Sequence, residues 1–520
     1  MWPVRKLMNA ELENRPSGWQ TILHTQELWL FLLLLICFAY FFPRWADWGQ
    51  NSKLDLTMAI VDQGTFVIDD YYHNTGDYAL YKGHHYSDKA PGTAFLGVPF
   101  YAVFKVVTSS SLLDRLMTRL SSNAALTATL QEGGSGLLRE KVYFAMALSF
   151  VTFFIISIPS AALGVVMYRF LGRFIARPRL RVLLVSAYGL ATVAYPFSMT
   201  LNGRQIVAGL TFAAFYLLYR YRRREVGPNA LWAVGFLMGW AAITDYPVGL
   251  ILVGLFVYAF FSAQDRRHLI RLVLAGIPPI ALAAWYNYRC FDTPLPVGYF
   301  YSELYTDLHY TGFLSLSFPT LSALYGLTFS PFRGLFYLSP FLLLAIPGFW
   351  LMGHDRTHRA EFWLCLWAAI SFFWFNSSSA MWWGGFSVGP AYLVPMVPYL
   401  MVPIAYVASS MWQWRWGKLI WGMLLAWSWL VTWAETLAGQ SFPDLTPNPL
   451  LAISLPRLAA GDIARNWGML FHLTGFASLI PLAVVAALML GALLLLERFR
   501  CSIGPLVQTM KPLPEGVKRQ

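Results

Sequence analysis

Long apolar runs, separated by short polar segments, dominate the chain from residue 28 to residue 496. A helix that crosses a membrane needs about 20 mostly apolar residues. By that measure the sequence predicts twelve spans, several of them short or interrupted by proline. They cover residues 28–43, 142–168, 182–200, 206–220, 229–244, 247–263, 269–287, 334–353, 361–377, 391–411, 419–437 and 474–496. The pattern therefore predicts an all-α polytopic membrane protein with a bundle of about twelve transmembrane helices.

Composition supports this class. The chain is 57% hydrophobic and only 12% charged, whereas soluble globular chains carry about 25% charged residues. Segment 1–27 is polar, and no small-residue cleavage site follows the first apolar run. We therefore expect that run to be a retained first span.

Basic residues are unevenly distributed among the loops. If the N-terminus lies inside and each span reverses the chain, the short basic loops, such as 169–181, 220–225 and 265–271, all fall on the inner side. Such a bias marks cytoplasmic loops. It predicts a membrane protein with both termini inside, and it explains the net charge of +12 by contact with anionic lipid rather than with nucleic acid.

The predicted organisation has five parts. They are a cytoplasmic segment (1–27), a transmembrane module (28–437) that includes an extracytoplasmic loop (44–141), a second extracytoplasmic loop (438–473), a last transmembrane helix (474–496) and a basic cytoplasmic tail (497–520). Two apolar stretches of the first loop, 52–64 and 91–107, are interrupted or short. We expect both to form helices at the membrane interface.

Polar residues collect near the outer ends of the predicted spans. Among them are Asp69, Asp70, Asp77, Asp88 and Lys89 in the first loop, and Arg204, Asp245 and Arg333 between later spans. Ionisable residues in so apolar a bundle mark functional sites, so we expect one outward-facing site built from several loops. Each residue also has a structural alternative, such as a solvated carboxylate for Asp77, a helix cap for Arg204 or a turn residue for Asp245. His73, His84 and His85 leave a divalent metal as an alternative, although their spacing fits no tight motif; we otherwise expect no cofactor.

Four segments resemble a known family. The stretches "NSKLDLTMAIVDQGTFVIDD" (51–70) and "TGDYALYKGHHYSDKAPG" (75–92) resemble the first loop of GT-C membrane glycosyltransferases, in the branch that contains protein O-mannosyltransferases and lipid A aminoarabinose transferases. "SPFRGLFYLSPFLLLAIPG" (330–348) and "MWWGGFSVGPAYLVP" (381–395) resemble bacterial members. The resemblance extends over roughly residues 28–400. It implies a GT-C-like bundle whose first loop carries two juxtamembrane helices. It also implies that the membrane is the bacterial plasma membrane.

The resemblance also implies a chemistry, namely transfer of a sugar, with inversion, from a polyprenyl-phosphate donor to an acceptor hydroxyl of a glycan, lipid or protein on the outer face. Such a reaction needs a carboxylate as general base and cations that stabilise the departing phosphate. "SDKAPG" (87–92) matches the family's acidic-Lys-Pro stretch, which implies that Lys89 binds the phosphate, with Arg204 and Arg333 as further ligands. The implied substrate pocket comprises Asp69, His84, His85, Tyr86, Asp88, Asp245, Tyr246, Trp382 and Trp383.

The position of the base departs from the family pattern. Aminoarabinose-transferase relatives place an acidic pair shortly after the first span, where this chain has Gln50 and Asn51. The role then passes to another carboxylate of the first loop. We expect Asp77 first, then Asp70 and then Asp55, with Asp47 and Asp69 as the other candidates. Relatives also often carry an arginine after the Gly-Pro of the 381–395 segment, where this chain has Ala391.

Two other functions fit parts of the sequence. Twelve spans with both termini inside also describe a major-facilitator transporter, but such transporters have two related halves and bind substrate at the membrane midplane. This chain shows no internal repeat and has a first loop of about a hundred residues. The second alternative is a GT-C-fold protein that binds lipid or assists assembly after losing its base.

Overall fold

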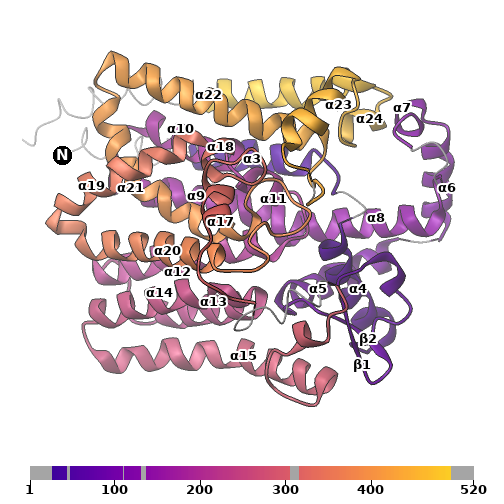
Figure 1. The fold of residues 1–520 in the computed structure, drawn as a ribbon, viewed down its shortest axis with the longest axis horizontal. Helices are drawn as coiled ribbons and strands as arrows, with labels where there is room; N and C mark the ends of the chain where they lie inside the picture. The colour runs from indigo at the N-terminus through magenta and orange to yellow at the C-terminus, as the bar shows by residue number, and fades with distance from the viewer. Residues whose placement is uncertain are drawn as a thin grey trace, which may run out of the picture.

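The computed structural model describes residues 26–43, 47–108, 110–130, 136–304, 315–444 and 446–493. Helices make up most of these residues, and the sheet within them is a single two-stranded one (Figure 1). The mostly helical class predicted from the sequence is confirmed. The N-terminal segment and the basic tail lie almost entirely outside the described residues.

Each of the twelve predicted spans coincides with a helix or with consecutive helices. They are α3 (Gln26–Ala39); α8, η2 and α9 (Arg139–Thr152, Phe153–Ser157 and Ile158–Leu171); α10 and α11 (Pro178–Leu190 and Ala194–Phe197); α12 (Gly203–Arg222); α13 (Ala230–Thr244); α14 (Gly249–Ser262); α15 (Leu269–Phe291); α18, η6 and α19 (Leu335–Leu338, Pro340–Leu344 and Ala345–His354); α20 (Arg359–Ser377); η8 and α21 (Ala391–Met396 and Val397–Met411); α22 (Arg415–Ala438); and a helical run over Gly475–Leu493.

Fewer than twelve helices of the described chain meet the length and composition expected of a membrane span. Four helical runs of the described chain are long and apolar enough to cross a membrane, or five if one bent pair is counted as a single span. Five further apolar helices have 10–17 residues. The structure therefore supports a multi-pass membrane protein, while the count of twelve spans stays a prediction.

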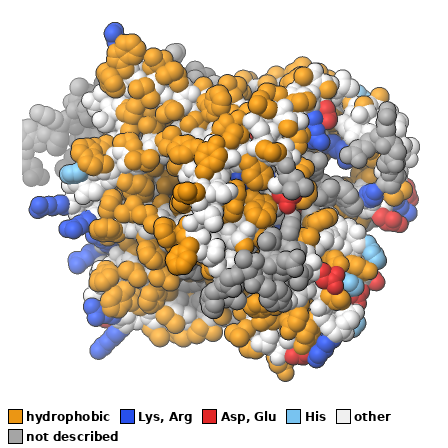
Figure 2. All heavy atoms as spheres, viewed as in Figure 1, with side chains coloured by type: hydrophobic (Ala, Val, Ile, Leu, Met, Phe, Trp, Pro, Cys, Tyr) orange, Lys and Arg blue, Asp and Glu red, His pale blue; other side chains and the backbone are white. Residues whose placement is uncertain are grey.

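The two ends of the bundle carry different charges. In Figure 2, Lys and Arg side chains gather at the left end, whereas acidic and histidine side chains gather at the right end. At the basic end, Arg173 pairs with Glu225 at 2.7 Å, and Tyr221 lies 3.0 Å from His268. Arg223 donates to the carbonyl of Thr357 at 3.3 Å. Loops that the charge pattern assigns to one side of the membrane are thus in contact.

The first loop lies at the other end of the bundle (Figure 1). It contains α4 (Trp48–Gln63), η1 (Tyr72–Asn74), the hairpin β1–β2 (Tyr78–Tyr81 and His84–Ser87), α5 (Gly92–Val107), α6 (Ser110–Ser121) and α7 (Ala124–Thr127). Helices α4 and α5 occupy the two stretches where interfacial helices were expected. The hairpin was not predicted. It turns through Lys82 and Gly83, whose φ angles of 51° and 84° match the turn that suits a tight hairpin.

Close backbone contacts hold α5 and α12 against the end of α13. A Cβ atom on Gly92, the first residue of α5, would lie 2.7 Å from the carbonyl oxygen of Ile243. One on Gly203, the first residue of α12, would lie 2.8 Å from the Thr93 hydroxyl and 3.0 Å from the Thr244 carbonyl. Only glycine fits at either position. The starts of α5 and α12 therefore meet the end of α13 at one point.

Candidate active site

Charged side chains converge where these helix ends meet the start of α4. Gln50 ties α4 to this point because its side-chain oxygen accepts a hydrogen bond from the backbone N–H of Leu201 at 2.7 Å. The converging charged residues are Asp47, Lys53, Asp77, Asp88, Lys89, Arg204 and Asp245, which we call the polar cluster. They come from α4, from the segments on either side of the hairpin and from the junctions at α12 and α13.

Lys89 lies between two carboxylates. Its Nζ is 3.0 Å from Asp77 Oδ2 and 3.2 Å from Asp88 Oδ1. Ser302 donates a further hydrogen bond to Asp88 Oδ2 at 3.1 Å. Burial alone would lower the pKa of Lys89, but the two carboxylates outweigh burial and hold this pKa well above its usual value. Lys89 is therefore a fixed positive charge.

Lys53 is a second ammonium in the cluster, and it has weaker partners. Its Nζ donates to the Gly49 carbonyl within α4. A Cβ atom on Gly49 would lie 3.2 Å from Asp77 Oδ2, 3.5 Å from Asp47 Oδ1 and 3.6 Å from Lys53 Nζ, so the three groups surround this glycine. Burial, together with repulsion from Lys89, lowers the pKa of Lys53 to about 8, although Asp47 and Asp77 oppose the shift. Within the described part of the chain, Lys53 forms no ion pair.

Arg204 and Asp245 form the opposite side of the cluster. The Arg204 guanidinium stacks on the Tyr392 ring, 4.1 Å from its centroid, and pairs with no carboxylate among the described residues. The backbone carbonyl of Asp245 accepts from the N–H of Val248 at 3.1 Å, but its carboxylate accepts no hydrogen bond from a described donor. Burial raises the pKa of Asp245, while Arg204 and Lys53 oppose the rise. Tyr299 lies nearby, with the Lys89 ammonium 5.7 Å from its ring centroid.

The carboxylates of the cluster differ in how fully they are bonded. Asp47 caps α4: its Oδ1 accepts from the backbone N–H groups of Gly49 and Gln50, and its Oδ2 accepts from the Gln50 side chain. Asp77 uses Oδ2 for Lys89, and no described donor contacts its Oδ1. Asp77 and Asp245 can therefore accept a proton from a bound molecule without breaking a helix cap.

Several predicted site residues lie outside the cluster. Asp69 accepts hydrogen bonds from the Nδ1 atoms of both His84 and His85 at 2.8 Å, which braces the hairpin. Asp70 lies on the exposed surface and accepts from Gln63 at 2.6 Å. Asp55 is fully buried, and its Oδ1 accepts from Asn74 at 2.9 Å. None of these carboxylates lies next to Lys53 or Lys89.

The remaining predicted residues have packing roles. The buried Tyr86 ring packs on Phe291, and the Tyr246 hydroxyl pairs with Asn287. The Trp382 ring covers Gly326 and packs against Phe332 and Trp383. Ala391 is buried.

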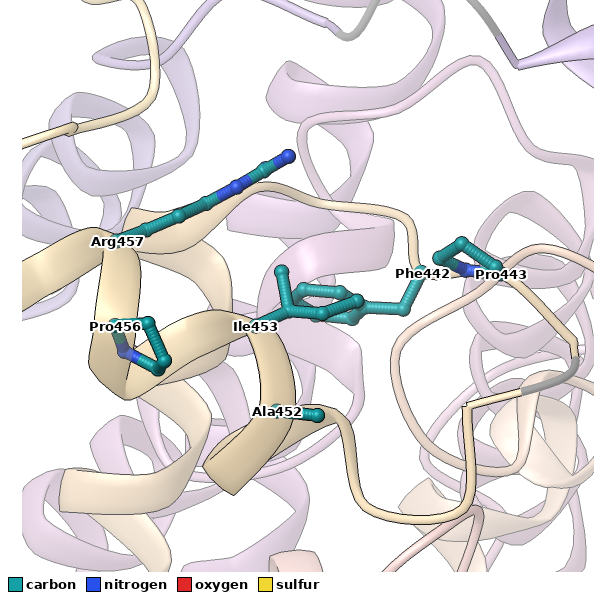
Figure 3. Close-up of a pocket in the computed structure, with 6 residues that line it drawn as sticks. All are labelled: Phe442, Pro443, Ala452, Ile453, Pro456 and Arg457. Carbon is teal, nitrogen blue, oxygen red and sulfur yellow. The ribbon is translucent and has the colours of Figure 1, made fainter.

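Arg333 is 1% exposed and binds backbone rather than the cluster. Its Nη2 donates to the carbonyls of Gly385 and Phe442 at 3.0 and 3.2 Å. Phe442 also lines a cavity of about 320 Å³ (Figure 3), together with Pro443, Ala452, Ile453, Pro456 and Arg457. Arg333 thus holds the segment behind that cavity in place.

One member of the polar cluster, Lys53, was not predicted from the sequence, and neither were the two aromatic residues beside the cluster, Tyr299 and Tyr392. Lys53 carried a usable signal because it is a lysine at the start of a stretch predicted to lie at the membrane interface. Tyr299 and Tyr392 carried none, since aromatic residues are common throughout this chain.

Metal binding was left open from the three histidines. The described residues contain no group of three or more His, Cys, Asp or Glu side chains arranged to hold a metal ion. His84 and His85 pair with Asp69, and the His73 ring packs at a tilt against Tyr72 with ring centroids 4.0 Å apart.

Fold and site together define a polytopic helical membrane protein with a buried charged cluster at the acidic end of its bundle. The structure is similar over nearly the whole chain to crystal structures of ArnT from Cupriavidus metallidurans, a lipid A aminoarabinose transferase of the GT-C family. The structure bound to undecaprenyl phosphate aligns over 97% of this chain and 83% of its own, at 16% identity and a TM-score of 0.44. The apo structure aligns over 92% and 75%, at 16% identity and a TM-score of 0.45. No protein-family model matches the chain, and no curated protein sequence matches it.

Proposed function

We propose that this protein is an integral-membrane glycosyltransferase that moves a sugar from a polyprenyl-phosphate donor to an acceptor hydroxyl on the extracytoplasmic face. The observation that carries the proposal is the convergence of three cations, Lys53, Lys89 and Arg204, in the polar cluster. Two of these three cations lack an ion-pair partner among the described residues. A bound phosphate would supply the missing negative charge.

The reaction needs the cluster in two roles. The acceptor oxygen attacks the anomeric carbon, the bond between that carbon and the phosphate oxygen breaks, and the acceptor proton passes to a carboxylate. Lys53, Lys89 and Arg204 stabilise the charge that grows on the departing phosphate. Asp77 is the proposed base because its Oδ1 is free of described donors while Lys89 fixes its Oδ2 at 3.0 Å. Asp245 is the second choice.

The test is binding and turnover of radiolabelled polyprenyl-phosphate sugars by the purified protein, with release of polyprenyl phosphate as the readout. Asp77→Asn should lower turnover by about 10²–10⁴-fold, the usual contribution of a general base, and should leave donor binding intact. Asp70→Asn removes the same charge outside the cluster and should leave turnover unchanged.

Other outcomes contradict parts of the proposal. If Asp70→Asn and Asp77→Asn lower turnover equally, Asp77 has no special role. If Asp245→Asn alone abolishes turnover, the base is Asp245. Failure of every polyprenyl phosphate to bind would refute the donor site and favour the transporter alternative.

A further inference from the structure

A groove opens between α14 and α20, at the end of the bundle far from the polar cluster. Its cavity volume is about 780 Å³. The lining residues are Arg222, Val253, Gly254, Val257, Tyr258, Phe261, Ser262, Arg359, Ala360, Trp363, Leu364, Leu366, Trp367 and Ile370. Arg222 ends α12, the helix that begins with Gly203 at the cluster. Twenty helical residues rise by about 30 Å, so the groove and the cluster lie at opposite ends of the same helix.

Most of the groove is apolar, and its walls are held in place. Val253, Val257, Trp363 and Ile370 are each about half exposed. Trp367 is fixed because its Nε1 donates to the Leu250 carbonyl at 2.8 Å, and its ring would lie 2.5 Å from a Cβ on Gly254. The missing side chain at Gly254 lets the indole lie directly against α14. An apolar molecule would therefore find a preformed surface.

One end of the groove is charged. Arg222 pairs with the buried Glu361 at 2.8 Å, and Tyr258 donates to the same Glu361 oxygen at 2.7 Å. The carboxylate of Glu361 thereby neutralises the charge of Arg222. Arg359 is exposed, and its guanidinium makes no hydrogen bond or ion pair with any residue that the structure describes. The groove therefore joins a long apolar wall to a net positive charge.

We propose that this groove binds an anionic glycerophospholipid, with its phosphate at Arg359 and Arg222 and an acyl chain along Val257, Trp363 and Ile370. A soluble anion would gain nothing from the apolar wall. A zwitterionic lipid carries its own cation beside the phosphate, so it would leave the net positive charge of the groove uncompensated. The basic end of the bundle is also where anionic lipid headgroups are attracted to Lys and Arg (Figure 2). The site is independent of the proposed glycosyl transfer.

The test is lipid retention by the full-length protein. Purified protein is equilibrated with equal amounts of phosphatidylglycerol and phosphatidylcholine in detergent, and the bound lipids are counted by native mass spectrometry. Wild type should retain phosphatidylglycerol in preference. Arg359→Gln should weaken that retention about fivefold, which corresponds to about 1 kcal/mol. Arg356→Gln, a loss of the same charge at a residue that does not line the groove, should leave it unchanged.

A second variant tests the apolar half. Val257→Trp fills the groove without changing charge, and it should lower phosphatidylglycerol retention while donor turnover stays at the wild-type value. Equal retention of the two lipids would overturn the proposal, as would an equal effect of Arg356→Gln and Arg359→Gln. Displacement of phosphatidylglycerol by a small excess of undecaprenyl phosphate would assign the groove to a polyprenyl carrier and would overturn it too.

Discussion

Lys53 provides the sharpest test of the polar cluster, because its charge is costly to the free protein. We expect Lys53→Met, which keeps the length of the side chain and removes the ammonium, to stabilise the protein and to weaken donor binding. Replacing a lysine that only stabilised the fold would instead lower the stability of the protein. This pairing of gained stability with lost function is typical of residues held in place for a ligand.

The magnitude follows from the pKa of Lys53. Burial, reinforced by Lys89, lowers this pKa from 10.5 to about 8. Each pKa unit corresponds to about 1.4 kcal/mol, so the charged form costs on the order of 3 kcal/mol in the folded state. Loss of the hydrogen bond from Lys53 to the Gly49 carbonyl costs less, about 0.5–1.5 kcal/mol. The net effect of Lys53→Met is therefore stabilising.

The stability gained by Lys53→Met should depend on pH in a characteristic way. Between pH 8 and 10.5 the unfolded chain holds a proton at Lys53 that the folded protein has released, so wild-type stability rises with pH across this window. Lys53→Met lacks this rise. The gain in stability should be full below pH 8 and should disappear as the pH approaches 10.5.

The assay is thermal unfolding of detergent-purified protein without ligand, at pH 7 and at pH 10. Lys105→Met is the control, because Lys105 pairs with Asp62 at 2.6 Å on a half-exposed surface and should lose at most about 1 kcal/mol at either pH. A lower melting temperature for Lys53→Met at pH 7, or an equal shift at both values, would refute the reasoning.

Three other predictions concern nearby features. Asp55→Asn should stabilise the protein at neutral pH and leave turnover unchanged. Burial raises the pKa of Asp55 well above its usual value, and a neutral amide can still accept from Asn74. Thermal unfolding at pH 7 measures the gain in stability, and a loss of turnover would make Asp55 a candidate base again. Gly92→Ala should destabilise the folded protein by about 1–3 kcal/mol because the new Cβ would meet the Ile243 carbonyl. Gly209→Ala, with open space around its Cβ, should be neutral or stabilising. Equal melting temperatures for the two variants would contradict the close approach at Gly92. Donor affinity should fall as the pH rises through 8, where Lys53 loses its proton, and titration with labelled donor should show no such fall for Lys53→Met.

Much of the fold could be read from the sequence because each feature has a local cause. Apolar runs of sufficient length predicted the helices of the bundle, and a shorter run interrupted by proline predicted α5. The hairpin was not predicted because its strands, Tyr78–Tyr81 and His84–Ser87, have only four residues each. Such short strands show almost none of the alternation of apolar and polar residues that marks a strand.

The site was predicted less completely than the fold. The sequence predicted one outward-facing site built from several loops and named Asp77, Asp88, Lys89, Arg204 and Asp245, which the structure brings together. It could not tell these from Asp69 and Asp70, because residue type alone does not show which partner a carboxylate finds. Asp69 meets two histidines across a hairpin, and Asp70 meets Gln63 from α4. Such pairings depend on contacts between segments, which one sequence does not record.

Helix α4 also restricts how related chains can differ in length. Its first turns carry Asp47 and Lys53, and one turn later the Thr57 hydroxyl donates to the Ala94 carbonyl of α5. Inserting or deleting one residue between Lys53 and Thr57 would rotate one half of the helix by about 100° relative to the other. The charged face would then turn away from Asp77 and Lys89. Related chains that keep the cluster should therefore have no insertion or deletion between Lys53 and Thr57.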